Sequence, residues 1–472
     1  MEVIADLHLH SKYSRAVSPQ MIIPEIAKWA KKKGIDLVGT GDWTHPLWLK
    51  ELQANLEETA QGIYKVKRCL AKKGIHLPGV PQAPHHLEGG SFSEVYFLLS
   101  TEISSIYSQG GKTRRIHNII LAPSFETVGK INEALRKKGA NLLSDGRPII
   151  GLSAKNLAEL VLGVDEKCLI IPAHSWTPWF SLYGSKSGFD SIEECFREMG
   201  KYIYGIETGL SSDPGMNWRI AELDNRSIVS FSDAHSLTKM GREATVFEVE
   251  EVEKLKYEDI KEAIMISPSR CAAGATPPGR CRLAYTVEFY PEEGKYHFTG
   301  HRNCKIKQNP EETVRLGETC PVCGKHLTIG VMQRVQELAG REVKSQKSKV
   351  KSGVTMIFDE EKKRTPYVKL VPLMEILAEA LGTLVGSQKV AEGFEKLIDN
   401  FDSEFTVLLK TQIEEIEKIS GPKVAEGIFR VRSGQVTIDP GYDGVFGTVK
   451  IWSESKDVEK NEQENGGQMS LL

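Results

Sequence analysis

The chain lacks long apolar segments. No stretch of about 18 consecutive apolar residues, the length at which a membrane-spanning helix becomes possible, occurs among its 472 residues. The N-terminus also lacks the basic and apolar regions of a signal peptide, because it leads straight into a short strand-like segment. The sequence therefore predicts no membrane partner and a cytoplasmic location.

An excess of charge of one sign is also missing. The 61 Lys and Arg nearly balance the 63 Asp and Glu, and the formal net charge is −2. The overall charge gives no sign of a polyanionic partner, so a nucleic-acid surface would have to be a local patch. Residues 281–351 are locally basic, with 13 Lys and Arg against 8 Asp and Glu. That excess favours contact with phosphate groups, although a solvated surface would give the same composition.

The eight cysteines do not show the spacing of a disulfide framework, because five are scattered and three lie close together. The close ones are Cys304 and the pair Cys320-Pro-Val-Cys323, and the pattern His301-x2-Cys304 precedes that pair. Two ligand pairs on tight turns satisfy the tetrahedral geometry of one structural zinc ion. The alternatives to His301 as the fourth ligand are His297 and His326.

Side chains that bind metals gather in the first half of the chain, nearly all after apolar, strand-like segments. The first segment leads into Asp6-Leu7-His8-Leu9-His10, and alternate strand residues face the same side, so His8 and His10 can hold one ion together. The further candidates are Asp42, His45, Glu102, His117, His174, Asp233 and His235. A single histidine at a strand end is usually structural. This set instead predicts a multinuclear metal site at the carboxyl ends of the strands of a parallel β/α barrel.

Five motifs together resemble the PHP (polymerase and histidinol phosphatase) phosphoesterases. They are Asp-Leu-His-Leu-His-Ser from Asp6, Gly-Thr-Gly-Asp-Trp-Thr-His up to His45, the strand ending in Glu102, Pro-Ala-His174 and Ser-Asp233-Ala-His235. The resemblance covers residues 1–280 and implies an α/β fold, a distorted seven-stranded β/α barrel with three divalent metal ions. Imidazole-rich ligation suits zinc, and the carboxylates also admit manganese or magnesium.

The same resemblance implies which residues would hold each ion. His8, His10, Glu102 and Asp233 would hold the first ion and form the catalytic set. Glu102 would bridge to a second ion held by His117 and His174, and a third ion would take His45, His235 and Asp42. The chain departs from the family at the second motif, which commonly reads Thr-Asp-His. It also has Ser14 or Arg15 where a further His is often found.

Such a metal cluster activates water for attack on phosphorus. Arg15, Arg114 and Arg115 are candidates to bind the phosphate group, with surface solvation as the alternative. A Pro-broken loop after His174 concentrates four aromatic residues: Trp176, Trp179, Phe180 and Tyr183. They predict a stacking pocket for a base turned out of the duplex, although core packing of one or two of them is the alternative.

Three further segments follow the expected barrel. Residues 281–343 are predicted to form the zinc-binding, ribbon-like domain, and residues 344–452 a mainly helical domain. Its first residues, 344–351, are polar and charged, and we expect them to be mobile or to follow DNA. The segment Ile416-Glu-Lys-Ile-Ser-Gly421-Pro-Lys423-Val-Ala425 resembles a helix-hairpin-helix turn, in which Gly421 and Lys423 would contact a DNA phosphate. An ordinary pair of antiparallel helices is the alternative.

Residues 453–472 have almost nothing to bury, and we expect them to be disordered. The chain ends in five residues that resemble the bacterial sliding-clamp binding motif: Gln468, Met469, Ser470, Leu471 and Leu472.

The whole order of parts, together with the segment Thr208-Gly-Leu-Ser-Ser-Asp-Pro-Gly-Met-Asn-Trp-Arg219, resembles the endonuclease Q family. That resemblance implies a nucleoid-associated DNA repair endonuclease. It would cut on the 5′ side of deaminated bases (uracil, hypoxanthine, xanthine) or abasic sites. The alternatives are a PHP phosphatase for small phosphomonoesters and a non-catalytic, clamp-associated DNA-binding protein.

Overall fold

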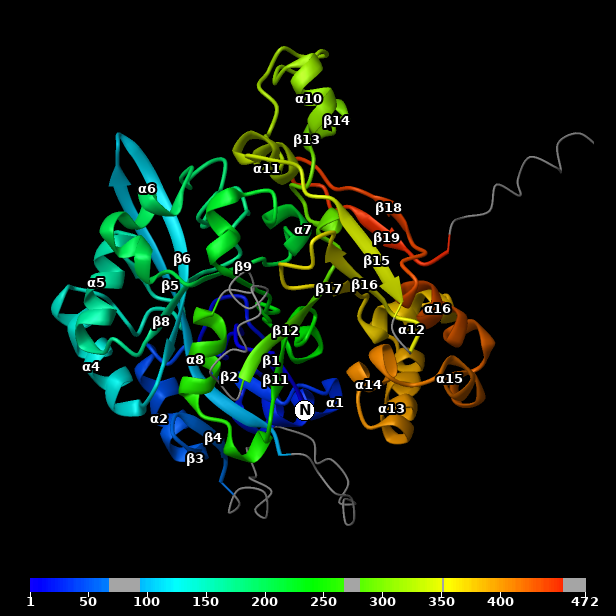
Figure 1. The fold of residues 1–472 in the computed structure, drawn as a ribbon, viewed down its shortest axis with the longest axis horizontal. Helices are drawn as coiled ribbons and strands as arrows, with labels where there is room; N and C mark the ends of the chain where they lie inside the picture. The colour runs from blue at the N-terminus through cyan, green and yellow to red at the C-terminus, as the bar shows by residue number, and fades with distance from the viewer. Residues whose placement is uncertain (68–93, 267–280, 350–351, 453–472) are drawn as a thin grey trace, which may run out of the picture.

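The computed structural model describes residues 1–67, 94–266, 281–349 and 352–452 (Figure 1). Thirteen strands form one mixed sheet. Ten of them follow one another in the order β15 (Ser345–Lys349), β16 (Thr355–Asp359), β17 (Tyr367–Lys369), β12 (Cys281–Glu288), β11 (Ala244–Val249), β1 (Glu2–Asp6), β2 (Leu37–Gly39), β5 (Tyr96–Gln109), β4 (Ile63–Val66) and β3 (Leu56–Ala60). The other three are β6 (Lys112–Ala122), β7 (Ile149–Ile150) and β8 (Leu169–Pro172). Strands β6 and β7 pair with β5, and β8 pairs with β6.

The parallel part of this sheet positions the candidate site. Strands β1, β2 and β5 run parallel, so their carboxyl ends point to the same edge. The separate parallel pair β9 (Gly205–Glu207) and β10 (Ser227–Val229) leads toward that edge. The backbone N–H of His10 donates to the carbonyl of Ala234 at 3.0 Å. The segment after β10 therefore lies against the segment after β1.

The sequence pattern predicts a parallel sheet, but part of the observed sheet is antiparallel. β5 and β6 form a long antiparallel hairpin, closed by Gly110 and Gly111, both with positive φ. β1 also pairs antiparallel with β11. Such a glycine turn can join adjacent strands only in an antiparallel arrangement, whereas a parallel pair needs a longer crossover.

Seven α-helices belong to the first half of the described chain: α1 (Ile23–Lys33), α2 (Pro46–Asn55), α4 (Phe125–Lys137), α5 (Ala154–Val164), α6 (Ile192–Phe196), α7 (Pro214–Asn217) and α8 (Tyr257–Met265). Helix α1 has Pro24 at its start and ends at Gly34, whose φ of 81° suits glycine. Its buried residues include Ile23, Ile26 and Ala30. Helix α2 ends at Asn55, because the next residues pair as β3 with β4.

Short 3-10 helices connect many of these elements: η1 (Arg197–Tyr202), η2 (Ala221–Asn225), η3 (Leu237–Lys239), η4 (Val252–Lys254), η5 (Pro291–Glu293) and η6 (Arg302–Cys304). Apolar side chains fill both faces of the central strands. Val3 and Ala5 belong to one buried cluster, whereas Ile4 belongs to another. This alternation is the period of two that a strand imposes.

The sheet continues past residue 280, where the sequence had suggested a domain boundary. β12 pairs antiparallel with β11 and parallel with β17. Within the segment 344–351, predicted to be mobile or to follow DNA, residues 345–349 form β15, which pairs with β16 over five residue pairs. Strands β12 and β15 form because they pair with other strands, and local composition does not reveal such pairing.

A module after β12 projects from the sheet at the top of Figure 1. It contains β13 (Thr299–His301), β14 (Ile306–Gln308), α10 (Pro310–Leu316) and α11 (Val331–Leu338). The C-terminal pair β18 (Thr437–Asp439) and β19 (Thr448–Lys450) contacts η5 at the start of this module.

Five helices form the C-terminal helical part, at the lower right of Figure 1: α12 (Leu373–Leu381), α13 (Gln388–Phe401), α14 (Glu404–Leu409), α15 (Ile413–Ser420) and α16 (Pro422–Arg432). A buried ion pair joins this part to α1, because Lys33 Nζ lies 2.6 Å from Glu404 Oε2. Among the described residues, no helix has both the length and the apolar character that crossing a bilayer requires.

Arg432 is a buried cation that ties the helical part together, with 1% of its surface exposed. Its guanidinium donates to the carbonyls of Leu408 at 2.9 Å, Thr411 at 2.7 Å and Ser352 at 2.8 Å. Leu408 lies in the last turn of α14, where unpaired carbonyls carry partial negative charge. Arg432 therefore supplies these carbonyls with hydrogen-bond donors from a buried side chain.

We expect Arg432→Met to lower the free energy of unfolding by about 3 kcal/mol or more, because several buried carbonyls lose their partner. Arg430→Met is the matched control. Arg430 lies on the same helix in a surface ion pair with Glu426, which is worth about 1 kcal/mol or less. Urea denaturation followed by circular dichroism measures both variants. Equal, small shifts of the midpoint would contradict the assigned role of Arg432.

Candidate functional site

The first group of candidate metal ligands is formed by His8, His10, Glu102 and Asp233, whose ligand atoms all lie within 4.8 Å of one another. His10 Nε2 lies 3.1 Å from Asp233 Oδ1 and 3.3 Å from Glu102 Oε2. His8 Nε2 lies 3.6 Å from the same Asp233 oxygen. Both Nε2 atoms and Asp233 Oδ1 are buried and make no hydrogen bond. A divalent cation fits these converging, unpaired atoms.

The second group is formed by Glu102, His117 and His174. His174 Nε2 lies 3.0 Å from Glu102 Oε1, and His117 Nδ1 also contacts that oxygen. Glu102 therefore presents one carboxylate oxygen to each group. It lies within β5, opposite Ile119 of β6. His117 lies opposite Ser104 in the hairpin, diagonally across from Glu102, and its ring reaches the Glu102 carboxylate. This geometry suits a carboxylate that bridges two ions.

Two further carboxylates lie behind the imidazoles. Glu207 Oε1 lies 2.9 Å from His8 Nδ1, and Asp42 Oδ1 lies 3.0 Å from His10 Nδ1. Such a contact fixes the tautomer, so that the opposite ring nitrogen faces the metal, and it makes that nitrogen more basic. Glu207 Oε2 also accepts the backbone N–H of His174 at 2.7 Å. Glu207 thus links ligands of both groups.

Asp42 was expected to be a ligand of a third ion, but the structure places it behind His10. It accepts the backbone N–H and hydroxyl of Ser11 and the hydroxyl of Ser14, all at 2.6–2.9 Å. Ser14 stands where the PHP family often has a histidine, and here it supports Asp42 instead.

His45 and His235, the other expected ligands of a third ion, lie outside both groups. The ring of His45 stacks on Tyr13 with centroids 4.4 Å apart, and burial lowers the pKa of His45. His235 Nδ1 bonds to the Asp233 carbonyl at 2.8 Å, and its ring lies 4.8 Å from that of His10. The described residues therefore bring together two ligand groups in this half of the chain, where three ions were expected.

Three site residues have backbone angles that L-amino acids rarely adopt. The φ values are 46° at Asp42, 31° at His174 and 47° at Asp233. Such conformations cost of order 1–3 kcal/mol each and occur mainly where a functional geometry requires them. Close packing supports them: a Cβ on Gly146 would lie 2.3 Å from Asp42 Oδ2. Only glycine fits at that position.

Charges around the groups keep the carboxylates ionised. Burial alone would raise the pKa of Glu102, but the contact with His117 and the fixed charge of Arg147 hold that pKa well below its usual range. Burial likewise opposes ionisation of Asp233, and the charges of His8 and His10 lower its pKa. Burial lowers the pKa of His117 to about 4, which keeps its ring neutral and able to bind a metal.

Arg147 is a site residue that the sequence did not reveal. Its Nη1 lies 3.0 Å from Glu102 Oε2, and 24% of its side chain is exposed. It follows Gly146 in a loop, without a strand-like segment before it that could have marked it. The sequence also assigned no role to Glu207, although Glu207 follows an apolar run as the candidate ligands do.

The four aromatic residues after His174 divide into two kinds. Trp176 and Tyr183 are buried, pack on each other at 4.7 Å between centroids and bond to Asn217 and Glu222. This pair belongs to the core, and the prediction that they stack on a base is corrected. Trp179 and Phe180 are half-buried, and the Phe180 ring lies 4.8 Å from that of His117. Of the four, these two keep exposed surface, and Phe180 lies beside a candidate metal ligand.

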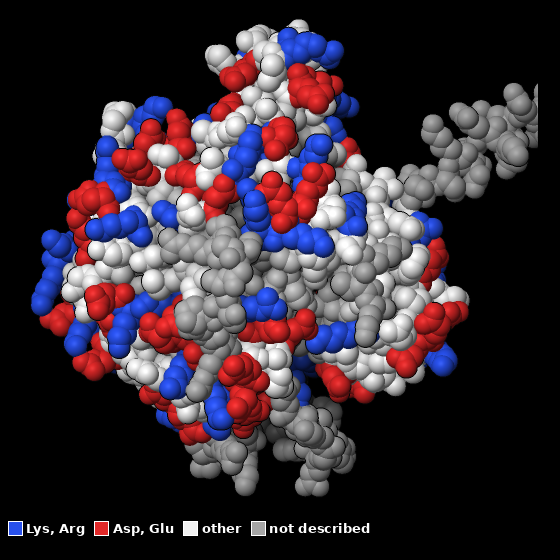
Figure 2. All heavy atoms as spheres, viewed as in Figure 1, with Lys and Arg blue, Asp and Glu red and all other residues white. Residues whose placement is uncertain are grey.

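The three arginines predicted to bind phosphate differ in setting. Arg15 has an exposed side chain whose Nε lies 3.4 Å from Asp145 Oδ2. Arg114 donates to the carbonyl of Gly188, and its guanidinium stacks over Phe189 at 4.0 Å. Arg115 lies over Phe180 at 5.6 Å. Figure 2 shows Lys and Arg intermixed with Asp and Glu on the face in view, as the balanced charge predicts.

A third ligand group lies in the projecting module and consists of His301, Cys304, Cys320 and Cys323. The structure thus selects His301 over the two alternatives. His297 is buried and packs on Phe298 with ring centroids 5.2 Å apart. His326 pairs by its backbone with Thr319. Three sulfur atoms and one imidazole suit tetrahedral zinc.

Helices α15 and α16 form the predicted hairpin, and Gly421 joins them with φ 84°. Lys423 in the first turn of α16 has Nζ 3.8 Å from the Trp452 ring centroid and 3.8 Å from Glu426 Oε2. These contacts fit either kind of helical hairpin. The clamp motif at residues 468–472 lies outside the described residues.

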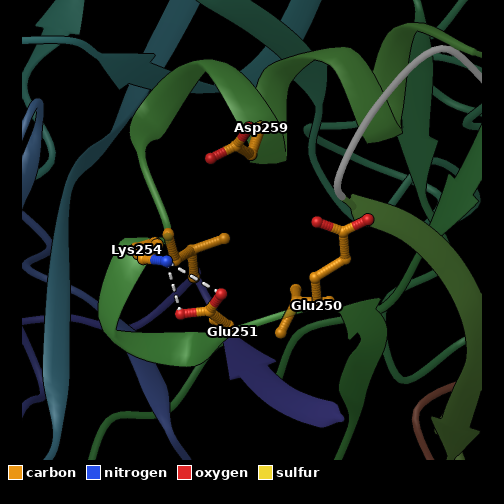
Figure 3. A pocket seen from close by; sticks show the side chains of 6 residues that line it. Glu250, Glu251, Lys254 and Asp259 are labelled. Carbon is orange, nitrogen blue, oxygen red and sulfur yellow. Dashed lines mark hydrogen bonds and ion pairs between the residues drawn. The ribbon is translucent and has the colours of Figure 1, made fainter.

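A surface pocket away from these groups is shown in Figure 3, lined by Val249, Glu250, Glu251, Lys254, Leu255 and Asp259. Lys254 Nζ lies 2.8 Å from Glu251 Oε2, and Asp259 accepts the backbone N–H of Lys256 at 2.8 Å. Its carboxylates outnumber its lysine, so the pocket disfavours phosphate. It does not belong to the candidate site.

Comparison with known proteins places this geometry in a family. A crystal structure of a lesion-specific endonuclease, endonuclease Q of Pyrococcus furiosus, superposes with a TM-score of 0.75 at 32% identity, over all of both chains. A second structure, endonuclease Q in complex with a 27-mer duplex carrying an abasic lesion at the active site, has a TM-score of 0.74 at 32% identity. It covers 98% of this chain and 100% of that one.

Two uncharacterized proteins are also similar to this chain in sequence. The uncharacterized protein YqxK of Bacillus subtilis is 27% identical over 95% of this chain and 99% of its own length. The uncharacterized protein MJ0043 of Methanocaldococcus jannaschii is 32% identical over 58% of this chain, and the match spans only 31% of that longer protein. Residues 372–435 match the MJ0043 C-terminal domain family.

Together with the fold and the candidate metal-ligand groups, these similarities place the chain in the class of DNA endonucleases. The chain belongs to the endonuclease Q family, as its motifs predicted.

We expect Glu207→Gln to weaken metal binding about 10- to 100-fold, because loss of the carboxylate behind a ligating histidine reduces its basicity and its fixed orientation. Glu126→Gln is the control, since Glu126 is an exposed residue paired with Lys130 on α4. Chelator competition followed by metal analysis measures both affinities. Equal affinities in the two variants would show that Glu207 does not support His8.

Proposed function

We propose that the protein is a metal-dependent DNA repair endonuclease. It hydrolyses the phosphodiester on the 5′ side of deaminated bases or abasic sites. The observation that carries the proposal is the shared carboxylate of Glu102, which belongs to two candidate metal-ligand groups. Full-length similarity to a lesion-specific endonuclease, and to its complex with abasic DNA, supports DNA as the substrate.

The residues present fit two divalent ions at this centre. The ions, when bound, would supply activated water and would neutralise charge on the phosphoryl oxygens. His8, His10 and Asp233 would hold one ion, His117 and His174 the other, and Glu102 both. We further propose that the strands around them form the distorted barrel of PHP proteins.

Arg147 gives the centre a fixed positive charge beside the metal groups. Its guanidinium contacts Glu102 and is partly exposed, whereas the Glu102 side chain is fully buried. Nearby Asp233 and His235 have 26% and 35% of their side chains exposed. These three residues mark the accessible side of the centre. There Arg147 would donate to a phosphate oxygen, with the planar geometry that suits arginine for this role.

The remaining modules would hold DNA rather than cut it. Trp179 and Phe180 are the aromatic rings that would stack on a lesion nucleotide. Phosphates would be contacted by the projecting module with the His301 ligand group, called the zinc module below, and by the α15–α16 hairpin at Gly421. We propose four segments with distinct roles, residues 1–280, 281–343, 344–452 and 453–472, with strands of the second and third segments extending the sheet of the first. The last would carry the sliding-clamp motif, which would associate the enzyme with the nucleoid.

Cleavage of labelled duplexes tests this function. Duplexes carrying one uracil, one hypoxanthine or one abasic site are incubated with manganese or magnesium beside an undamaged duplex. We expect a single nick on the 5′ side of the lesion. Asp233→Asn should abolish it because a ligand charge is lost. Asp399→Asn, at an exposed position of α13, should leave it unchanged.

Two outcomes would overturn the proposal. Intact DNA together with phosphate release from small phosphomonoesters would identify a phosphatase of the histidinol phosphate type. Tight binding of the lesion duplex without cleavage under any metal would identify a DNA-binding protein instead.

A further inference from the structure

The loop that follows metal ligand His174, residues 175–190, is fastened to the zinc module by one arginine. Arg334 lies on α11 and has only 14% of its side chain exposed. Its Nε donates to the carbonyl of Tyr183 at 3.1 Å. Its Nη2 donates to the carbonyl of Phe189 at 3.2 Å and contacts Asp190. One planar guanidinium thus binds two turns of the loop at once.

The loop itself is compact and has a strained tip beside the metal centre. Phe189 N–H donates to the carbonyl of Leu182 at 2.7 Å, and Tyr183 N–H to that of Ser175 at 2.8 Å. Phe180 has a φ of 64°, an angle that its surroundings must enforce. Its carbonyl accepts the N–H of His117 at 3.2 Å. A shift of the loop would therefore move the exposed aromatic rings relative to the metal ligand His117.

A second contact fastens the same loop to the same module. The Trp179 ring meets Tyr296 edge to face, with centroids 5.5 Å apart. The backbone carbonyl of Tyr296 in turn accepts the backbone N–H of Val331, the first residue of α11, at 2.8 Å. The zinc-ligand end of the module is continuous with this helix, because Gly330 N–H donates to Thr299 Oγ1 at 3.1 Å, two residues before His301. Zinc site, α11 and aromatic loop thus form one connected structure.

We propose that Arg334 is a positioning residue through which the zinc module sets the conformation of the aromatic loop, and hence the affinity for the lesion nucleotide. This inference rests on the proposed function for its substrate. Arg334 itself touches neither the metal-ligand groups nor the exposed rings, so it acts through the loop carbonyls.

The chain offers a matched control in Arg341, which also joins the zinc module to the first half of the chain. Arg341 Nη2 donates to the carbonyl of Trp218 at 2.9 Å, and its Nη1 lies 2.6 Å from Asp224 Oδ2. Both arginines attach the module through a backbone carbonyl and a carboxylate, but only Arg334 binds the aromatic loop. If attachment of the module alone mattered, substitution of either arginine would lower cleavage of the lesion duplex to the same extent.

We expect Arg334→Ala to lower kcat/KM for the lesion duplex about tenfold, because two charge-assisted hydrogen bonds to the loop are lost. Most of the change should be in KM. Hydrolysis of a small aryl phosphodiester and the metal content should stay unchanged, since the centre is intact. Arg334→Lys should rescue part of the loss, because an ammonium group cannot bind both carbonyls in one plane. Arg341→Ala should change kcat/KM less than twofold.

Hydrogen exchange of the loop separates this inference from the proposed function. Peptides covering residues 176–190 should exchange faster in Arg334→Ala than in Arg341→Ala, whatever the substrate. Equal exchange in the two variants, or an equal loss of cleavage in both, would overturn the positioning role. If the unaltered protein nicks no lesion duplex, the proposed function fails together with the link to lesion affinity. Faster loop exchange would then still show that Arg334 positions the loop.

Discussion

Glu102 is the residue on which the candidate centre depends. It lies in the middle of a long central strand with its carboxylate fully buried, and such a charge is stable only beside compensating cations. Arg147 supplies one fixed cation, and the imidazoles of both ligand groups surround the rest of the carboxylate. Bound divalent ions would complete the compensation. The fold thus buries a charge at the one position where two groups of ligands meet.

The surroundings of Glu102 show how the fold maintains this arrangement. Carboxylates behind His8 and His10 orient the two rings, and left-handed backbone angles at Asp42, His174 and Asp233 turn the chain sharply at the site. These features cost stability, and extensive burial on both sheet faces offsets that cost. Outside the centre, Arg334 on α11 of the projecting module contacts the loop after His174.

Much of this could be predicted from the sequence, because strand periodicity and ligand chemistry are local signals. The spacing of His8 and His10 put them on one face, and apolar runs marked Glu102, His174 and Asp233. Local patterns could not show which carboxylate faces a metal, so Asp42 was assigned as a ligand although it lies behind His10. They also missed Arg147 and the pairing of β12 with β11, since both depend on contacts between distant segments.

Metal content per chain is the measurement that tests the shared carboxylate most directly. The unaltered protein should hold at least two ions besides the zinc of the Cys304 group, as measured by elemental analysis after dialysis. Glu102→Gln should lose those ions while it keeps the cysteine-bound zinc, which reports that the chain is still folded. His117→Asn should lose one ion and keep the other. Full metal content in Glu102→Gln would contradict the view that this carboxylate holds the centre together.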